Sequence, residues 1–170
     1  MAKLIAKTPC DGVLPLKIGT LTLEEVVIDK AVSVAPFKGQ EKTVAAAMPV
    51  AFPKPNRVSG TDPRAIWIGP GQALLIGGEV SDVPAAVVDQ TDGIAVVRIS
   101  GAQVKDVLAR QVPVDVAAMK PGHTARTLIG HMTGSVTCVG RDKFELIVMR
   151  SMAGTLVHDL ERSARIFFAR

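Results

Sequence analysis

Residues 87–122 read VVDQTDGIAVVRISGAQVKDVLARQVPVDVAAMKPG, and this stretch decides the fold. The polar segment 89–93 predicts a turn, and the β-branched run Ile94–Ile99 predicts a strand. Ser100 follows as a candidate helix cap, and aliphatic residues then recur at helical spacing over 104–111. A strand that leads into a helix folded back over it can bury the apolar faces of both. We therefore expect this unit at the centre of the core.

The composition is that of a globular chain of 170 residues, which is a normal length for one domain. The formal charge is +4, but Lys and Arg are scattered among acidic residues and form no basic run. This distribution argues against nucleic-acid binding. The positive mean hydropathy favours a chain that hides some apolar surface in an interface.

Neither a leader nor a membrane span is expected from the apolar segments. The N-terminus lacks the pattern of a signal peptide, and the longest apolar run, Val44–Phe52, is short and interrupted by Pro49. Cys10 and Cys138 are far apart and belong to no CxxC motif, so two thiols in a reducing compartment are the default, with a disulfide left open. We expect a cytoplasmic protein that binds no membrane.

Residues 1–60 carry the weakest pattern in the chain. Aliphatic residues alternate over 14–18 and continue to Ile28, which predicts short strands or an extended arm. The passage 49–62 is rich in Pro, Asn, Ser and Gly and predicts a loop. We therefore expect an irregular N-terminal arm with short strands over 1–60, lying on its own domain or on a partner, and an α+β domain over 61–170. The two parts would form one globular unit.

A hairpin is expected directly after the arm. The runs Ile66–Ile68 and Leu74–Ile76 are strand-like, and Gly and Pro between them predict a tight connection. Trp67, the single tryptophan, is either a half-buried core aromatic or a ligand-stacking residue.

The C-terminal third predicts a three-stranded antiparallel meander and a helix. The segments 124–131, 134–139 and 144–148 alternate, and a polar turn precedes the third segment. Ser151 is a candidate cap for the helix that follows. The apolar stripe of that helix is Ala153, Leu156, Val157, Leu160, Ala164 and Phe167. Together the elements predict a two-layer α+β fold, with an antiparallel or mixed sheet and helices packed mainly on one face.

Residues with catalytic potential are few. His123 and His131 would be about 26 Å apart on an extended strand, so they cannot share a metal within it, and no pair of histidines has zinc-ligand spacing. The phosphate-binding, nucleophile-elbow and zinc-protease motifs are all missing from the sequence. The residues therefore point to neither a metal site nor a catalytic centre.

Several short motifs, in order, resemble the gamma subunit of heterotetrameric sarcosine oxidase. They begin with WIGPGQALL at 67–75 and DQTDG at 89–93 and run to about residue 160. The residues that carry the resemblance are Trp67, Gly69, Pro70, Asp89, Gly93, Arg98, Ser100, Gly101, Gly122, Gly130, Arg150 and Ser151. The chain departs from the family at Thr91, where a serine is usual, and over 77–86, which is short for the helix common there.

The same stretch is similar, more distantly, to the N-terminal part of the folate-using aminomethyltransferase of glycine cleavage. The resemblance places Asp115 at the position of that family's catalytic aspartate, where it could contact folate. The structural alternative is that Asp115 caps backbone N–H groups of residues 116–118. We expect no counterpart of the transferase's second domain within these 170 residues.

The resemblance implies a structural, non-catalytic subunit. The whole complex would demethylate sarcosine to glycine by oxidation, with FAD, FMN, NAD, tetrahydrofolate and zinc held by other subunits. The alpha subunit would be the direct partner, and the beta and delta subunits would belong to the same assembly. The alternative hypothesis is a stand-alone folate-binding or one-carbon-transfer domain.

Overall fold

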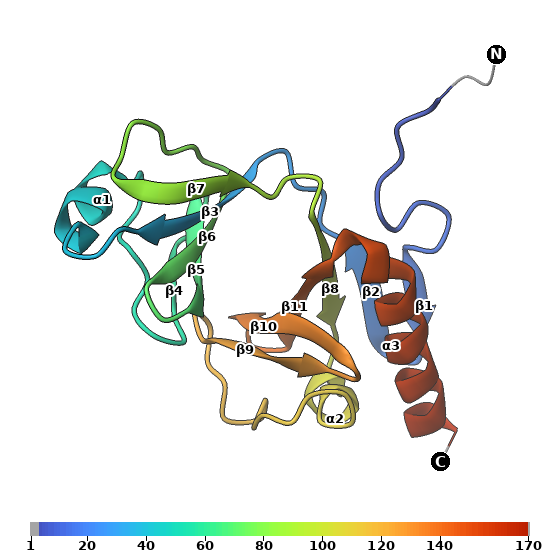
Figure 1. The fold of residues 1–170 in the computed structure, drawn as a ribbon. Helices are drawn as coiled ribbons and strands as arrows, with labels where there is room; N and C mark the ends of the chain where they lie inside the picture. Colours follow the sequence, from blue (N-terminus) through green and yellow to red (C-terminus); the bar gives the residue numbers. More distant parts are fainter. Residues whose placement is uncertain (1–3, 170) are drawn as a thin grey trace.

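The computed structural model describes residues 4–169, which form two antiparallel sheets and three α-helices (Figure 1). The strands are β1 (Leu16–Ile18), β2 (Leu21–Glu25), β3 (Ala31–Pro36), β4 (Val58–Gly60), β5 (Arg64–Gly69), β6 (Gln72–Ile76), β7 (Ala85–Asp89), β8 (Ile94–Ser100), β9 (Thr124–Ile129), β10 (Met132–Gly140) and β11 (Lys143–Met149). The helices are α1 (Glu41–Ala47), α2 (Val104–Leu108) and α3 (Ala153–Phe168), and a 3-10 turn, Arg150–Met152, precedes α3.

The two sheets take their strands from different parts of the chain. The six-stranded sheet has the order β1-β2-β8-β11-β10-β9, and the five-stranded sheet has the order β4-β5-β6-β3-β7. All neighbouring strands are antiparallel. The expected hairpin is β5–β6, and the expected meander is β9–β10–β11; both are confirmed.

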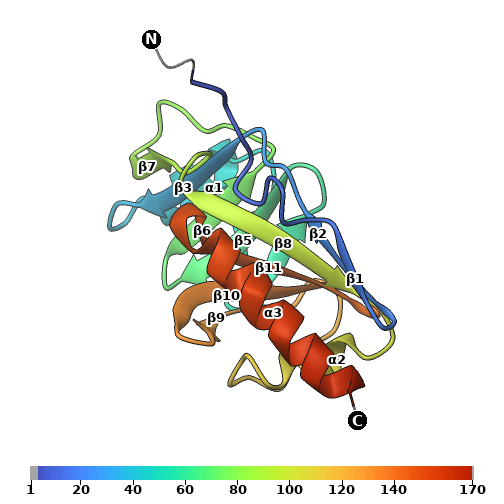
Figure 2. The same cartoon turned by 90° about the vertical axis from the view of Figure 1, so that its right-hand side faces the viewer.

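The largest core lies between the six-stranded sheet and helices α2 and α3. Alternate side chains of β8 and β11 point to this side, among them Val97 and Leu146, and both are fully buried. The expected stripe of α3 covers them with Leu156 and Leu160. Figure 2 shows α3 lying across the strands of this sheet. Within the described chain no helix is long and apolar enough to cross a bilayer.

Two smaller hydrophobic clusters pack against the two faces of the five-stranded sheet. On its outer face α1 buries Val44 against Val34 and Leu75. Its inner face meets the six-stranded sheet, where Ile66 packs in one cluster with Ile147. The α+β class expected from the sequence is confirmed, and the layers are the helix α1, the two sheets, and the helices α2 and α3 (Figure 1). The sequence pattern predicted a single sheet because alternation shows only that a strand has an apolar face, and not which sheet it joins.

The first sixty residues hold the short strands expected there, but these strands are built into both sheets. β2 lies between β1 and β8 in one sheet, and β3 lies between β6 and β7 in the other. Cys10, which precedes these strands, is already buried in the helix-side core, so the segment is part of the folded body and not an arm laid over it.

The prediction that Ser100 and Ser151 cap the following helices is wrong. Ser100 still belongs to β8, and Ser151 lies in the 3-10 turn, so neither precedes its helix directly. The residues before α2 and α3 make no side-chain capping bond. At the first site the chain turns sharply through Gly101, whose φ is +136°, and an added Cβ would lie 2.3 Å from the Thr20 carbonyl oxygen. This turn delays the start of α2 by several residues and takes Ser100 out of capping position.

Candidate functional site

A row of polar side chains crosses the inner face of the six-stranded sheet. Strand pairing places Arg98 of β8 opposite Glu145 of β11, and Glu145 opposite Thr137 of β10. Thr137 in turn is opposite Thr124 of β9, and their hydroxyl oxygens are 2.8 Å apart. The alternation that sends Val97 and Leu146 into the helix-side core sends these residues towards the five-stranded sheet.

Glu145 is the charged centre of this row and is 1% exposed. Its Oε1 accepts hydrogen bonds from Arg98 Nε at 3.1 Å and Nη2 at 2.7 Å. Arg64 of β5 approaches from the other sheet, with Nη2 2.6 Å from Oε2. That contact is an ion pair without hydrogen-bond alignment, since Oε2 has no hydrogen-bond partner within residues 4–169. The triad joins the two sheets electrostatically, as expected for a buried carboxylate, which requires compensation by cations.

A cavity of about 440 Å³ opens beside the triad, and we call it the Glu145 pocket. Four charged side chains line it, three of them cationic: Arg64, Arg98, Lys143 and Glu145. The wall is completed by Gly60, Thr61, the connector at Pro121 and Gly122, and residues 137–139 of β10.

A second cavity, of about 380 Å³, lies between the sheets towards their other end, and we call it the Ser135 cavity. The Ser135 hydroxyl is buried and has no hydrogen-bond partner among the described residues. Arg126 of β9, directly opposite Ser135, is the cation that lines this cavity. Gln72 and Gln90 add polar groups, and the other wall residues are mostly aliphatic.

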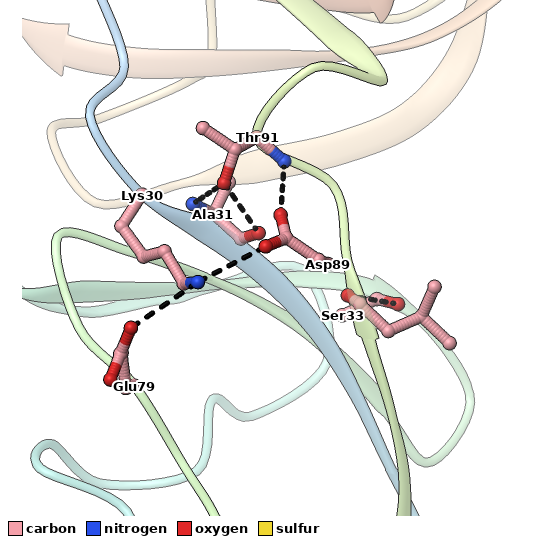
Figure 3. A network of polar contacts seen from close by, with 7 residues as sticks. Lys30, Ala31, Ser33, Glu79, Asp89 and Thr91 are labelled. Carbon is pink, nitrogen blue, oxygen red and sulfur yellow. Dashed lines mark hydrogen bonds and ion pairs between the residues drawn. The ribbon is translucent and has the colours of Figure 1, made fainter.

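Figure 3 shows an ion-pair network at the end of β7. It adjoins the Ser135 cavity, because Gln90, the residue after Asp89, lines that cavity. Lys30 Nζ is 3.0 Å from Asp89 Oδ2 and 3.2 Å from Glu79 Oε1. Thr91 donates its backbone N–H to Asp89 Oδ1 at 2.8 Å. The hydroxyl and backbone N–H of Thr91, with the Lys30 ammonium, lower the pKa of Asp89 to about 2. Thr91 also ties this turn to β3, because its hydroxyl oxygen accepts a hydrogen bond from the Ala31 backbone N–H at 3.1 Å.

Asp115 is exposed and lines neither of these cavities. Its Oδ1 accepts a hydrogen bond from the backbone N–H of Ala118 at 3.1 Å. This is the capping contact that the sequence offered as the structural alternative to a folate contact.

The residues that carry the family resemblance lie in separate places. Arg98 and Gly122 line the Glu145 pocket, whereas Gly93, Arg150 and Ser151 surround a shallow hollow beside the N-terminal segment. The others occupy strand ends and turns: Trp67 and Gly69 in the last part of β5, Pro70 in the β5–β6 turn, Asp89 at the end of β7, Ser100 at the end of β8, Gly101 directly after it, and Gly130 between β9 and β10. Trp67 is half-buried. These positions do not converge on one centre.

The remaining candidates are also dispersed. His131 and His158 are exposed, and His123 is half-buried. Within residues 4–169 no three His, Cys, Asp or Glu side chains are placed to hold a metal ion. Cys10 and Cys138 are separate buried thiols. Burial, followed by the nearby Glu25 carboxylate, raises the pKa of the Cys10 thiol to about 11.

Sequence reasoning missed Glu145, Arg64 and Ser135. A signal for Glu145 was present, because it is the one charged residue inside the apolar run of β11. Such a residue must either face water or meet a buried partner. The sequence could not name Arg64 as that partner, since it comes from the other sheet and is 81 positions earlier.

Comparisons with known proteins find the fold but no close relative in sequence. A chain of the heterotetrameric sarcosine oxidase from Corynebacterium sp. U-96 superposes with a TM-score of 0.83, covering 97% of both chains at 19% identity. The two chains share one fold. The glycine cleavage system aminomethyltransferase T from Bartonella henselae superposes with a TM-score of 0.60 at 15% identity. That match covers 87% of this chain but 47% of the transferase, so this chain spans about half of it. No family model matches the sequence, and no curated protein is similar to it.

Proposed function

We propose that this chain is the non-catalytic gamma subunit of a heterotetrameric, flavin-dependent sarcosine oxidase. One observation carries the proposal: the structural match to a sarcosine oxidase chain is complete in both directions, with 97% of each chain covered. A fold shared from end to end is what an equivalent subunit would show, whereas the transferase match leaves more than half of that enzyme without a counterpart.

The use of the polar residues supports a structural role. Asp115 holds the backbone at Ala118, and Arg98 neutralises Glu145. The network at Asp89 ties β7 to Lys30 beside β3. Each of these contacts stabilises the fold.

In the proposed assembly this subunit packs on the alpha subunit, with the beta and delta subunits in the same cytoplasmic complex. The oxidation of an N-methyl amine moves two electrons and requires a cofactor to accept them. FAD, FMN, NAD, tetrahydrofolate and zinc would be held by the other subunits.

Co-expression with candidate alpha, beta and delta chains from the same genome tests the proposal. The expected result is a stoichiometric, yellow complex that oxidises sarcosine, and an isolated chain that is colourless and inactive. A chain that stays apart from all three partners during size-exclusion chromatography would refute it.

A stand-alone folate-binding domain is the second candidate, and the Ser135 cavity favours it. A buried hydroxyl without a partner, aliphatic walls and a cation at Arg126 suit a ligand with an apolar body and a carboxylate. Calorimetric titration of tetrahydrofolate into the pure chain tests this reading. Saturable binding that is weakened by Ser135→Val and unchanged by Asp115→Ala would support the folate-binding hypothesis, with the Ser135 cavity as the site. The absence of any heat of binding would refute this hypothesis.

A further inference from the structure

The Glu145 pocket has a surplus of positive charge that the protein does not neutralise. Arg64, Arg98 and Lys143 line it with Glu145 as the single carboxylate. Two other carboxylates are near in the fold, because Glu24 is opposite Arg98 in the sheet and Asp142 precedes Lys143 in the turn. Neither of them forms an ion pair with a pocket cation in the described part of the chain.

The two guanidinium groups also retain unused donors. Arg98 directs Nε and Nη2 at Glu145, and Arg64 directs Nη2 at the same carboxylate. No hydrogen bond links Arg98 Nη1, Arg64 Nε or Arg64 Nη1 to another described residue. The Arg64 side chain is 16% exposed, and its free nitrogen atoms are not among the fully buried atoms that lack a hydrogen-bond partner, so they remain accessible. An acceptor that enters the pocket can therefore bond them.

Glu145 fixes the positions of both arginines. A buried carboxylate that holds two guanidinium groups side by side limits their rotamers, so they would lose little side-chain entropy on binding a ligand. Oxyanions match this arrangement, since carboxylate and phosphate oxygens accept paired N–H donors from arginine. Lys143 at the rim adds an exposed charge that attracts an anion from solution.

We infer that the Glu145 pocket binds a small oxyanion, with a carboxylate or phosphate group held by Arg64, Arg98 and Lys143. Glu145 is a positioning residue in this site and does not contact the anion. The volume of about 440 Å³ leaves room for a ligand larger than the anionic group alone. The inference is independent of the proposed subunit role, because it concerns the chain by itself.

Titration of the full chain with inorganic phosphate, and separately with succinate, tests the inference. Sodium chloride holds the ionic strength constant, and NMR follows the Nε–Hε signals of Arg64 and Arg98. Both signals should shift and saturate. Lys143→Glu should weaken the apparent affinity about tenfold, because it replaces an attractive charge with a repulsive one. The anion that saturates at the lower concentration identifies the preferred group.

Lys42→Glu is the matched control, since Lys42 is an exposed residue of α1 on the far side of the five-stranded sheet. This variant makes the same change in net charge and should leave the affinity unchanged. Because Lys143 is exposed, the melting temperature of the ligand-free Lys143→Glu variant should equal that of the parent chain. Shifts that never saturate, or an equal loss of affinity in both variants, would overturn the inference.

Discussion

The interface between the two sheets buries a charged group at one end and a neutral hydroxyl at the other, and only the charged group is compensated. At one end Glu145 is 1% exposed and held by two arginines from different sheets. At the other end Ser135 is equally buried, and its hydroxyl has no hydrogen-bond partner in the part of the chain that the structure describes. A buried charge would be prohibitively costly without compensation, whereas an unpaired hydroxyl costs only a few kcal/mol at most. The comparison shows that compensation is built where the cost of its absence would be greatest.

Removing the carboxylate should produce the largest effect. Glu145→Ala leaves Arg64 and Arg98 facing each other without an anion and should lower the free energy of unfolding by about 3 kcal/mol. This expected loss lies at the low end of the range for breaking a buried ion pair, because the Arg98 side chain is 33% exposed. Urea unfolding measures the change. Glu24→Ala, which removes an exposed carboxylate opposite Arg98 in the same sheet, is the control and should stay within about 0.5 kcal/mol of the parent chain. A loss of less than 1 kcal/mol in Glu145→Ala would break the comparison, because the charged end would then need no compensation.

The neutral part of the polar row should be less sensitive. Thr137→Val removes the hydroxyl that lies 2.8 Å from the Thr124 hydroxyl, at a cost of about 1 kcal/mol. The cost stays small because Thr124 keeps its bond to the Val136 carbonyl oxygen. Thr133→Val at an exposed position of the same strand is the control for β-propensity. A cost as large as that of Glu145→Ala would show that the row acts as one network.

The Ser135 hydroxyl should contribute nothing to the stability of the ligand-free chain. Ser135→Ala should leave the free energy of unfolding unchanged or raise it by up to about 1 kcal/mol, because it removes a buried group that lacks a hydrogen bond. Thermal and urea unfolding check this result. A clear loss of stability would mean that the hydroxyl has a partner, and the contrast between the two ends would then disappear.

Lowering the pH should produce the smallest of these effects on stability, through the Asp89 network beside the Ser135 cavity. The folded-state pKa of Asp89 is lowered to about 2, so its contribution to stability is complete above the ordinary carboxyl pKa of 3.8 and is lost as the pH falls towards 2. NMR titration of the Asp89 carboxyl carbon should follow this midpoint. Lys30→Met should move it part of the way back towards 3.8, since the Thr91 donors remain. A midpoint unchanged by Lys30→Met would leave Thr91 as the sole cause.

The local elements were predictable because their signals are local. The hairpin at Gly69–Gln72 and the meander after Thr124 follow from alternation interrupted by turn residues, and the stripe of α3 follows from its period. The caps at Ser100 and Ser151 failed because a cap depends on where the chain turns. At Gly101 that position is set by the close approach of Thr20, more than eighty residues earlier.

The candidate site was less accessible to sequence reasoning than the fold. Arg98 was singled out as part of a family motif, but its partner Glu145 was not, and Arg64 reaches that partner from the other sheet. The contact between Arg64 and Glu145 depends on how the two sheets face each other. That arrangement depends in turn on long-range strand pairings, such as β2 with β8, and no local sequence pattern encodes such pairings.

The assignment of strands to sheets also sets an order of assembly. All strands of the five-stranded sheet lie between residues 31 and 89, so its pairings can form while the rest of the chain is still being synthesised. The edge of β2 that faces β8 cannot pair until β8 has been synthesised, and β11, the other neighbour of β8, comes later still. During that interval the newly made chain exposes one side of a strand that is buried in the finished protein, and this is when a chaperone would matter most.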